Sequence, residues 1–420
     1  MSAAIHWRRD IHRHPEVGFA EFRTASRIAG RFADLGWRVR TGTDAMSAAD
    51  RLGVPDAESL DAAYERAAAD GADERFLPRM RGGLTAVVAT VDSGQPGPAI
   101  GLRADIDALP IVESVDSGHL PARDGFRSSY DGVMHACGHD GHIGMAVELA
   151  ERLAERPLTA GSLTIFFQPA EEGGRGARAM VPVGLADRID LFLAMHVGLG
   201  LPTGRYLSSV DGLLANSKLK AVFHGVAAHA SIAPHEGRNA LLGAATAMLG
   251  IHALPRIPGH ETRAGVGRIS GGTSSNIVPD RAEMLLETRG DLGVVNEHLE
   301  SRARDVLTGA AAMHGLTVDI ETIGGTTTAT ADPEAVSAIE TAAVSAGLQV
   351  ADGLPVGLAS DDATTFMRHV QENGGKATYV GLGATLAGPH HTPAFDFDEA
   401  ALPLGVDLLE SLVRLGQTFA

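Results

Sequence analysis

Residues 134 to 142, MHACGHDGH, contain the only cysteine of this 420-residue chain. Cys137 and His139 are two residues apart in a glycine-flanked loop that leads into a predicted helix. The N-terminus of a helix stabilises negative charge and lowers the pKa of a thiol, which favours the thiolate that binds metals. The alternative is an inert buried thiol, because cysteine is among the most buried residue types.

A second stretch, FFQPAEEGGRGA, places Glu171 and Glu172 directly after an apolar run. The side chains of neighbouring residues diverge, so one carboxylate can bind a metal while the other accepts a proton from water that the metal acidifies. The alternative is a solvated acidic turn. The glycines in GGRGAR lack both the lysine and serine of a phosphate loop and the dinucleotide-binding spacing, which argues against phosphate binding.

Three more candidate donors are histidines. His196 ends the apolar run LFLAMHV, and His390 and His391 occur in GPHHTPAFDFDE. A single histidine after a strand is more often a core or capping residue than a ligand. Together, however, the candidates form a mixed set of sulfur, nitrogen and oxygen donors with a spare carboxylate. Such a set suits two divalent ions, Zn²⁺ or Mn²⁺, with an open position for water.

The elements that must position these residues are predicted from the apolar runs. LTAVVATV, AIGLRADID, LTIFFQP and LFLAMHV are short, and helical segments separate them. This alternation predicts an α/β fold with a mainly parallel sheet, whose strand ends carry the candidate donors. A helix is expected over residues 20–35, and residues 44–80 are expected to form an exposed helical insertion.

From about residue 204 the pattern changes to strand, helix, strand, strand, helix, strand. This order is that of a ferredoxin-like domain. We therefore expect a discontinuous metal-binding catalytic domain over 1–203 and 326–420. The domain inserted between these segments, 204–325, is expected to act as a lid or dimerisation domain.

The composition excludes several other classes of protein. The formal net charge of −17 argues against nucleic-acid binding, which needs a basic face. No apolar run is long enough to span a bilayer, and no membrane association is expected. The first residues lack the apolar core of a signal peptide, so a cytoplasmic location is expected. A single cysteine excludes an internal disulfide framework.

The motifs RADIDALP, MHACGHDGH, QPAEEGGRGARAM, MHVG, GVAAHAS and HHTPAFDFDE occur in this order along the chain. In this they resemble the two-metal amidohydrolases of the aminoacylase and carboxypeptidase G superfamily, in the branch of hippurate and auxin-conjugate hydrolases. The segment GVPDAESLDAAYERAAADGADERFLP is further similar to the A subunits of aminobenzoyl-glutamate hydrolases. The resemblance implies hydrolysis of p-aminobenzoyl-glutamate, a folate breakdown product, to p-aminobenzoate and glutamate. A broader amidohydrolase of hippurate or indoleacetyl-amino acids is the alternative.

The resemblance also implies roles for individual residues. Glu171 becomes the general base and acid, and Asp105 orients a ligand. For Asp105, a strand-end cap or an ion pair with Arg103 remains an alternative. His391 is preferred to His390 because it stands directly before Thr-Pro. The implied metal ligands are Cys137, His139, Glu172, His196 and His391.

The inserted domain supplies three further residues by the same resemblance. His229 hydrogen-bonds the developing oxyanion in the site of the neighbouring protomer, while Asn276 and Arg289 hold the substrate. Arginine suits a carboxylate because its planar fork pairs in bidentate fashion. The alternatives are a loop histidine, a turn asparagine and a solvated strand arginine. The implied assembly is a homodimer or a pair with a related second protein. A non-catalytic role as one half of a heteromer is less well supported, because the base and all five ligands are present.

Overall fold

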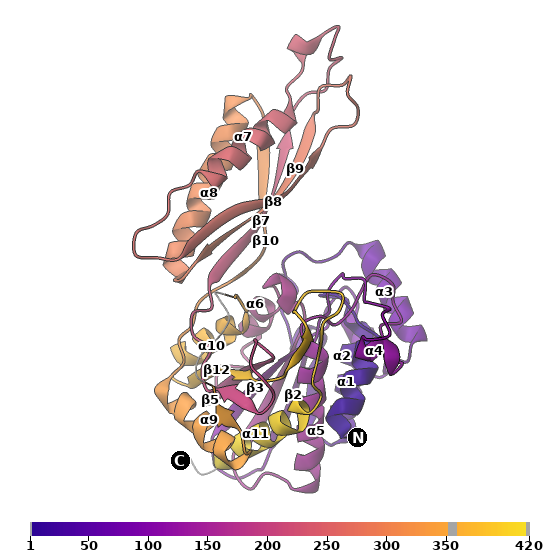
Figure 1. Cartoon of the computed structure of the whole chain (residues 1–420), viewed down its shortest axis with the longest axis vertical. Coiled ribbons are helices and arrows are strands. Elements are labelled where there is room, and N and C mark those ends of the chain that lie inside the picture. The colour runs from indigo at the N-terminus through magenta and orange to yellow at the C-terminus, as the bar shows by residue number, and fades with distance from the viewer. Residues whose placement is uncertain (1, 352–358, 417–420) are drawn as a thin grey trace. The chain divides into compact units, whose positions relative to one another are not determined.

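The structure of the chain is a computed structural model that describes residues 2–351 and 359–416. The chain divides into two compact units (Figure 1). The larger unit comprises Met1–Asp211 and Ala329–Ala420, and the smaller unit is Gly212–Thr328.

The larger unit is built on an eight-stranded sheet with the order β1-β2-β4-β3-β5-β12-β6-β11. Its middle strands β4, β3, β5 and β12 run parallel to one another. The runs that the sequence indicated thus form a mainly parallel sheet, and the predicted fold class is confirmed. The strands are β1 (Arg38–Thr41), β2 (Val87–Asp92), β3 (Ala99–Asp105), β4 (Ser162–Gln168), β5 (Leu191–Val197), β6 (Arg205–Leu207), β11 (Gln349–Val350) and β12 (Lys376–Leu382).

Both faces of this sheet are covered, as the near-continuous apolar strands require. Phe167 of β4 packs edge-on against Phe32 of α2, with ring centroids 5.1 Å apart, and Phe166 points the other way to Phe366 of α10, 5.2 Å away. The helices are α1 (Ala3–Arg13), α2 (Phe22–Asp34), α3 (Ala57–Ala69), α4 (Leu120–Arg123), α5 (His139–Glu155), α6 (Ala177–Met180), α9 (Pro333–Ser345), α10 (Ala363–Glu372) and α11 (Ala401–Gly416). Two short strands, β13 (Leu386–Gly388) and β14 (Asp396–Phe397), pair with each other.

The helix expected over residues 20–35 is α2. The expectation of an exposed insertion over residues 44–80 is wrong for one face of α3. Four apolar residues of this helix, Leu60, Ala63, Tyr64 and Ala67, are buried in the main core. Their spacing of three, four and seven residues places them on one stripe of the helix.

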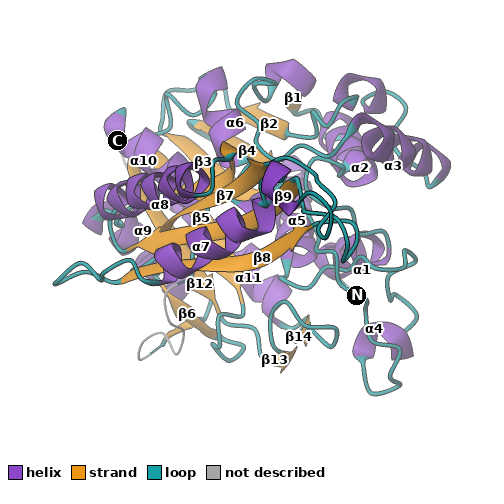
Figure 2. Cartoon of the chain, turned by 90° about the horizontal axis from the view of Figure 1, so that it is seen from above, coloured by secondary structure: helices purple, strands orange, loops and turns teal. Residues whose placement is uncertain are grey.

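The smaller unit is a four-stranded antiparallel sheet with the order β10-β7-β9-β8, and α7 and α8 lie on one of its faces (Figure 2). This is the predicted ferredoxin-like arrangement. Its elements are β7 (Ala215–His224), α7 (Ala240–His252), β8 (Thr262–Gly271), β9 (Arg281–Gly290), α8 (Gly293–Met313) and β10 (Thr317–Thr326). Alternate residues of β7, including Leu219 and Phe223, face the helices and form a separate core.

The smaller unit begins after residue 211 because β6 still belongs to the large sheet, where it pairs with β11 and β12. Among the described residues, no helix is both long and apolar enough to cross a membrane.

Candidate metal centre

Cys137 and His139 stand on either side of Gly138, the residue before α5. Gly138 has a φ of 105°, and a Cβ atom added to it would lie 2.5 Å from Cγ2 of Val197. Only glycine combines this backbone conformation with so close an approach. The loop thereby lies against the end of β5, where Sγ of Cys137 is 3.3 Å from Nε2 of His196.

The paired glutamates occupy a short 3₁₀ turn, Glu171–Gly173, directly after β4. Ala170, which precedes the turn, has a φ of 53°, a left-handed conformation that strains a non-glycine residue. Its N–H donates to the buried carboxylate of Glu21 at 2.9 Å. The turn brings Oε2 of Glu171 within 3.8 Å of Nε2 of His139, and Oε2 of Glu172 within 3.4 Å of Nε2 of His391.

The five ligands predicted from the sequence fall into two groups of three that share Cys137. One group is Cys137, His139 and His196, and the other is Cys137, Glu172 and His391. Within each group the donor atoms all lie within 4.8 Å of one another. Zinc–nitrogen and zinc–sulfur bonds are about 2.0–2.3 Å long, so each group can close on one ion. Because Cys137 belongs to both groups, its thiolate would contribute to both sites.

The two adjacent histidines near the C-terminus have different surroundings. His391 has a φ of 61°, and its N–H donates to the carbonyl of Ala136 at 2.8 Å, which holds it beside Cys137. His390 packs against the ring of Phe395, with centroids 4.8 Å apart, and burial lowers its pKa to about 4. His391, which the sequence analysis preferred as a ligand, is the one of the two that joins a donor group.

The chemistry of His139 fits a bound cation. Its Nδ1 hydrogen-bonds the backbone carbonyl of Asp107 at 2.9 Å, which leaves Nε2 unprotonated in the neutral ring. This Nε2 is buried and has no hydrogen-bond partner among the described residues. Burial raises the pKa of Cys137 well above its ordinary value, and Glu172 raises it further. A divalent cation would reverse that effect by stabilising the thiolate.

Two aspartates of the RADID motif support the donor loop. The carboxylate of Asp105 contacts Nδ1 of His142 and pairs with Arg103, each at 2.5 Å. Asp105 therefore makes the ion pair that the sequence left as an alternative and also lies 3.5 Å from Nε2 of His139. Asp107 was not predicted. It accepts from His139 through its backbone carbonyl and from the N–H of Glu172 through its carboxylate, at 3.0 Å.

The spacing of Asp105 and Asp107 was an available signal for the second aspartate. Residues two apart in an extended segment project to the same side, so both carboxylates face the donor loop. Only Asp105 was predicted to support the site.

A buried polar network behind Glu171 was also missed. Arg103 is fully buried and pairs with Asp361 at 3.1 Å and with Asp362 at 3.4 Å. Oδ2 of Asp361 accepts from the hydroxyl of Tyr379 at 2.6 Å. Buried charges persist when they are paired and hydrogen-bonded in this way. Adjacent acids before α10 in the stretch SDDATTF were the only sequence sign of this network.

The environment of Glu171 suits a group that exchanges protons. Burial raises its pKa well above the ordinary value, and the nearby carboxylates of Asp361 and Glu172 raise it further. A carboxyl group of raised pKa can take a proton from water and return it to a leaving group. Bound cations would counter part of this shift.

The smaller unit brings two of its three predicted residues together. His229 forms an isolated antiparallel β-bridge with Ile277, and the carbonyl of Asn276 accepts a hydrogen bond from the N–H of Ala230 at 3.0 Å. Nδ1 of His229 accepts from two backbone N–H groups at 3.2 Å, so the proton is on the exposed Nε2. Arg289 lies at the far end of β9, about 27 Å along the strand from its start, beside Glu287. One chain thus does not bring Asn276 and Arg289 together.

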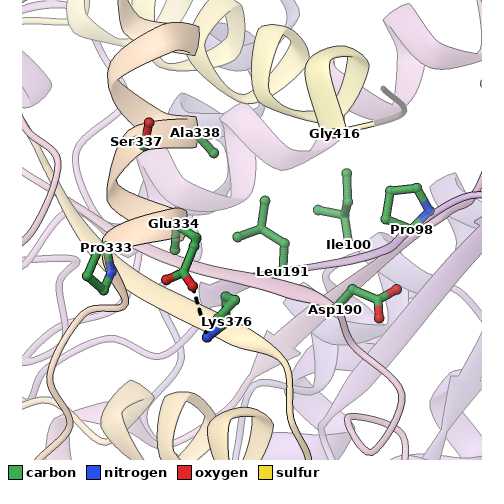
Figure 3. Close-up of a pocket in the computed structure, with 11 residues that line it drawn as sticks. Pro98, Ile100, Asp190, Leu191, Pro333, Glu334, Ser337, Ala338, Lys376 and Gly416 are labelled. Atoms are coloured by element: carbon green, nitrogen blue, oxygen red, sulfur yellow. Dashed lines mark ion pairs between the residues drawn. The ribbon is translucent and has the colours of Figure 1, made fainter. Parts of the chain in front are cut away.

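A cavity of 490 Å³ lies at the opposite edge of the large sheet (Figure 3). It is lined by the first residues of β5 and β12, Leu191 and Lys376, and by α9, from which Glu334 pairs with Lys376 at 3.3 Å. Two candidate donors lie toward the other ends of these parallel strands: His196 is the next-to-last residue of β5, and His391 follows β12. None of the donor groups described above lines the cavity, so the metal centre is the candidate catalytic site.

The fold and this donor set are those of a metal-dependent hydrolase. The sequence matches the family model described as Peptidase family M20/M25/M40 over residues 101–415. The chain belongs to this family, and it is a metal-dependent hydrolase of amide bonds.

Individual relatives match over nearly the whole chain. The chain is 42% identical to the indole-3-acetyl-aspartic acid hydrolase of Enterobacter agglomerans over 96% of its length and 93% of the relative's. It is 41% identical, with the same coverage, to the A subunit of p-aminobenzoyl-glutamate hydrolase from Escherichia coli. A crystal structure of an aminobenzoyl-glutamate utilization protein from Klebsiella pneumoniae has a TM-score of 0.85 and 38% identity, covering 98% of this chain and 95% of that one. These matches confirm the resemblance found in the sequence.

Proposed function

We propose that this enzyme hydrolyses the amide bond of p-aminobenzoyl-glutamate, releasing p-aminobenzoate and glutamate. The observation that carries the proposal is the pair of donor groups that share Cys137 beside Glu171. The 41% identity to the E. coli p-aminobenzoyl-glutamate hydrolase supports the choice of substrate.

We assign two divalent ions, Zn²⁺ or Mn²⁺, to this centre. Cys137, His139 and His196 would hold one ion, and Cys137, Glu172 and His391 the other. When bound, such ions polarise a carbonyl oxygen and lower the pKa of water. A reduced cysteine ligand agrees with a cytoplasmic location, where thiols stay reduced.

The protein's own side chains carry the proton and hold the substrate. Glu171 accepts a proton from the attacking water and delivers it to the nitrogen of the departing amine. Nε2–H of His229, contributed by the inserted unit of a neighbouring protomer, donates to the carbonyl oxygen as negative charge develops on it. Arg289 pairs with a carboxylate of the substrate, and Asn276 donates from its amide.

A role for His229 in a neighbouring site requires at least two chains, and we propose a homodimer formed by the inserted unit. Strand β8 is an edge strand, and edge strands offer unpaired backbone groups to a partner. Leu242 and Leu249, seven residues apart on α7, are 52% and 69% exposed. A related second protein is the alternative partner, because the E. coli relative is named as one component of a larger enzyme.

The assembly is tested by light scattering of the purified chain. A homodimer should have twice the chain's mass of 43.6 kDa, and Leu249→Glu should shift it toward the monomer. A wild-type chain that is monomeric alone but active only with a related protein would support the heteromer instead.

A second candidate substrate is indole-3-acetyl-aspartate, because the chain is 42% identical to a hydrolase of that conjugate. The purified enzyme, loaded with Mn²⁺ or Zn²⁺, should be assayed on both conjugates and on hippurate, with Glu171→Gln as the control. The proposal expects the highest kcat/KM on p-aminobenzoyl-glutamate and at least a roughly 100-fold loss in the control. Preference for another conjugate would change the substrate, and inactivity on all of them at full metal occupancy would favour a non-catalytic partner.

A further inference from the structure

Two arginines flank a buried aromatic ring in the larger unit. Cζ of Arg175 lies 5.4 Å and Cζ of Arg51 lies 5.8 Å from the centroid of the Phe19 ring. Phe19 is fully buried and has a φ of 64°, a strained conformation for a bulky residue. Cation–π contacts hold a guanidinium by its face and leave its N–H edge available to a ligand.

Backbone carbonyls tether both guanidinium groups. Nη1 of Arg175 donates to Gly53 at 2.7 Å, and Nη1 of Arg51 donates to Gly82 at 2.5 Å. Among the described residues, no carboxylate forms an ion pair with either arginine, and Nε of Arg175 is buried without a hydrogen-bond partner. Burial lowers the pKa of Arg51. Half-buried cations without a counter-charge are costly, which makes them candidates for an anionic ligand.

The pair lies beside the candidate catalytic turn. Arg175 is three residues after Glu172, and its side chain covers Gly173 so closely that an added Cβ there would be 2.0 Å from Nε. Nη2 of Arg175 lies close to Gly18, where an added Cβ atom would be 2.7 Å from it. The neighbouring Val17 is bridged to Ala108, the residue after Asp107. The positive charge is thus adjacent to the turn that carries Glu171.

We propose that Arg51 and Arg175 bind the side-chain carboxylate of the substrate's amino acid, so that the enzyme selects amides of aspartate or glutamate. A carboxylate matches the N–H edge of a guanidinium and supplies the missing counter-charge. This inference rests on the proposed amide hydrolysis and adds the residues that choose the amino acid. The segment 44–80 then has a functional role, because it contributes Arg51 and the carbonyl that holds Arg175.

The two hydrolases cited above are consistent with this assignment. Their names specify different acyl groups, indoleacetyl and aminobenzoyl, but both specify an acidic amino acid. A site for the side-chain carboxylate is the element that two such substrates would share.

The test compares p-aminobenzoyl-glutamate with p-aminobenzoyl-glutamine, which differ only in the side-chain charge. The ratio of their kcat/KM values is measured in the metal-loaded wild type and in Arg175→Met, Arg175→Lys and Arg51→Met. We expect the wild type to prefer the glutamate conjugate about 30-fold in kcat/KM and the methionine variants to lose this preference, with a ratio near 1. Arg175→Lys should have an intermediate ratio, because lysine keeps the positive charge but lacks the planar guanidinium. Arg178→Met is the matched control, because Arg178 is exposed and also donates to a carbonyl of the 44–80 segment, at 3.1 Å from Asp50.

Binding without turnover separates this inference from the proposed reaction. Titration calorimetry of both ligands in a Glu171→Gln background should give the same ratio in Kd. If no amide is hydrolysed, the proposed function fails, whereas the Kd ratio still decides the role of the arginines. Equal binding of the two ligands while both arginines are present, an unchanged ratio in Arg175→Met, or an equal fall in Arg178→Met would overturn the inference.

Discussion

His12 of α1 is enclosed by two carboxylates behind the metal-binding loop. It is fully buried, with Nδ1 at 2.8 Å from Asp140 and Nε2 at 2.9 Å from Glu113. Burial alone would lower its pKa, but the hydrogen bonds and charges of Asp140 and Glu113 outweigh burial and raise the pKa to about 9. The imidazolium is therefore the form that the folded protein stabilises.

The expected effect on stability follows from this pKa. A rise from 6.5 to about 9 corresponds to roughly 3 kcal/mol in the free energy of unfolding. Because the folded-state pKa is the higher one, this contribution is complete below pH 6.5 and is lost as the pH rises through 9. In His12→Gln the contribution is absent. The variant should thus be less stable by roughly 3 kcal/mol at pH 6, and the difference should shrink by pH 10.

Urea unfolding of the metal-free protein between pH 6 and 10 measures this difference. Both tryptophans, Trp7 and Trp37, belong to the larger unit, so their fluorescence reports its unfolding without interference from the inserted unit. His6→Gln, an exposed change on the same helix, is the control and should change stability by less than about 0.5 kcal/mol. A difference between wild type and His12→Gln that is constant, or that grows with pH, would refute the reasoning.

Three further predictions concern the metal centre and its support. Cys137→Ser should weaken both metal sites because the thiol belongs to both donor groups, and elemental analysis should find well under two ions per chain. The control His390→Ala should retain two ions, whereas two ions in Cys137→Ser would contradict a shared thiolate. Gly138→Ala should lower the free energy of unfolding, measured by thermal unfolding, by about 1–3 kcal/mol more than Gly132→Ala, whose added Cβ meets open space. Equal losses in the two variants would show that the close contact of Gly138 with β5 does not matter for stability. Arg103→Met should lower the free energy of unfolding by about 3–5 kcal/mol in urea because it removes the guanidinium that balances the buried carboxylates of Asp105 and Asp361. A near-neutral change would disprove this expectation.

The strands of the large sheet could be predicted from the sequence for a physical reason. Buried parallel strands are continuous apolar runs, so β4 and β5 are visible without an alignment. Glu171, just after β4, and His196, at the end of β5, therefore stand at a known edge of the sheet. The grouping of donors around Cys137 could not be predicted from spacing, because it depends on how loops from distant segments meet.

Two kinds of burial were harder to predict. The alanine-rich composition of α3 hid a regular apolar stripe that includes Leu60 and Tyr64. Buried charges were missed because charge patterns normally indicate exposure. Arg8 in WRRDIHRH is fully buried, where it pairs with Asp396 and with Glu399 and lies 3.9 Å from the ring centroid of Phe397. Tertiary contacts with distant segments, including Asp140 at 3.4 Å, explain that position.

The order of the strands in the large sheet has a consequence for synthesis of the protein. Strand β12 lies between β5 and β6, and His391 follows it, so the sheet and the candidate metal centre need segments that are synthesised after the inserted unit. The inserted unit, by contrast, takes all its strands from residues 215–326 and can fold while the C-terminal segment is still being translated. The complete set of donors is therefore available only after His391 has been synthesised, and a nascent chain arrested before β12 would carry a folded inserted unit but no complete metal centre.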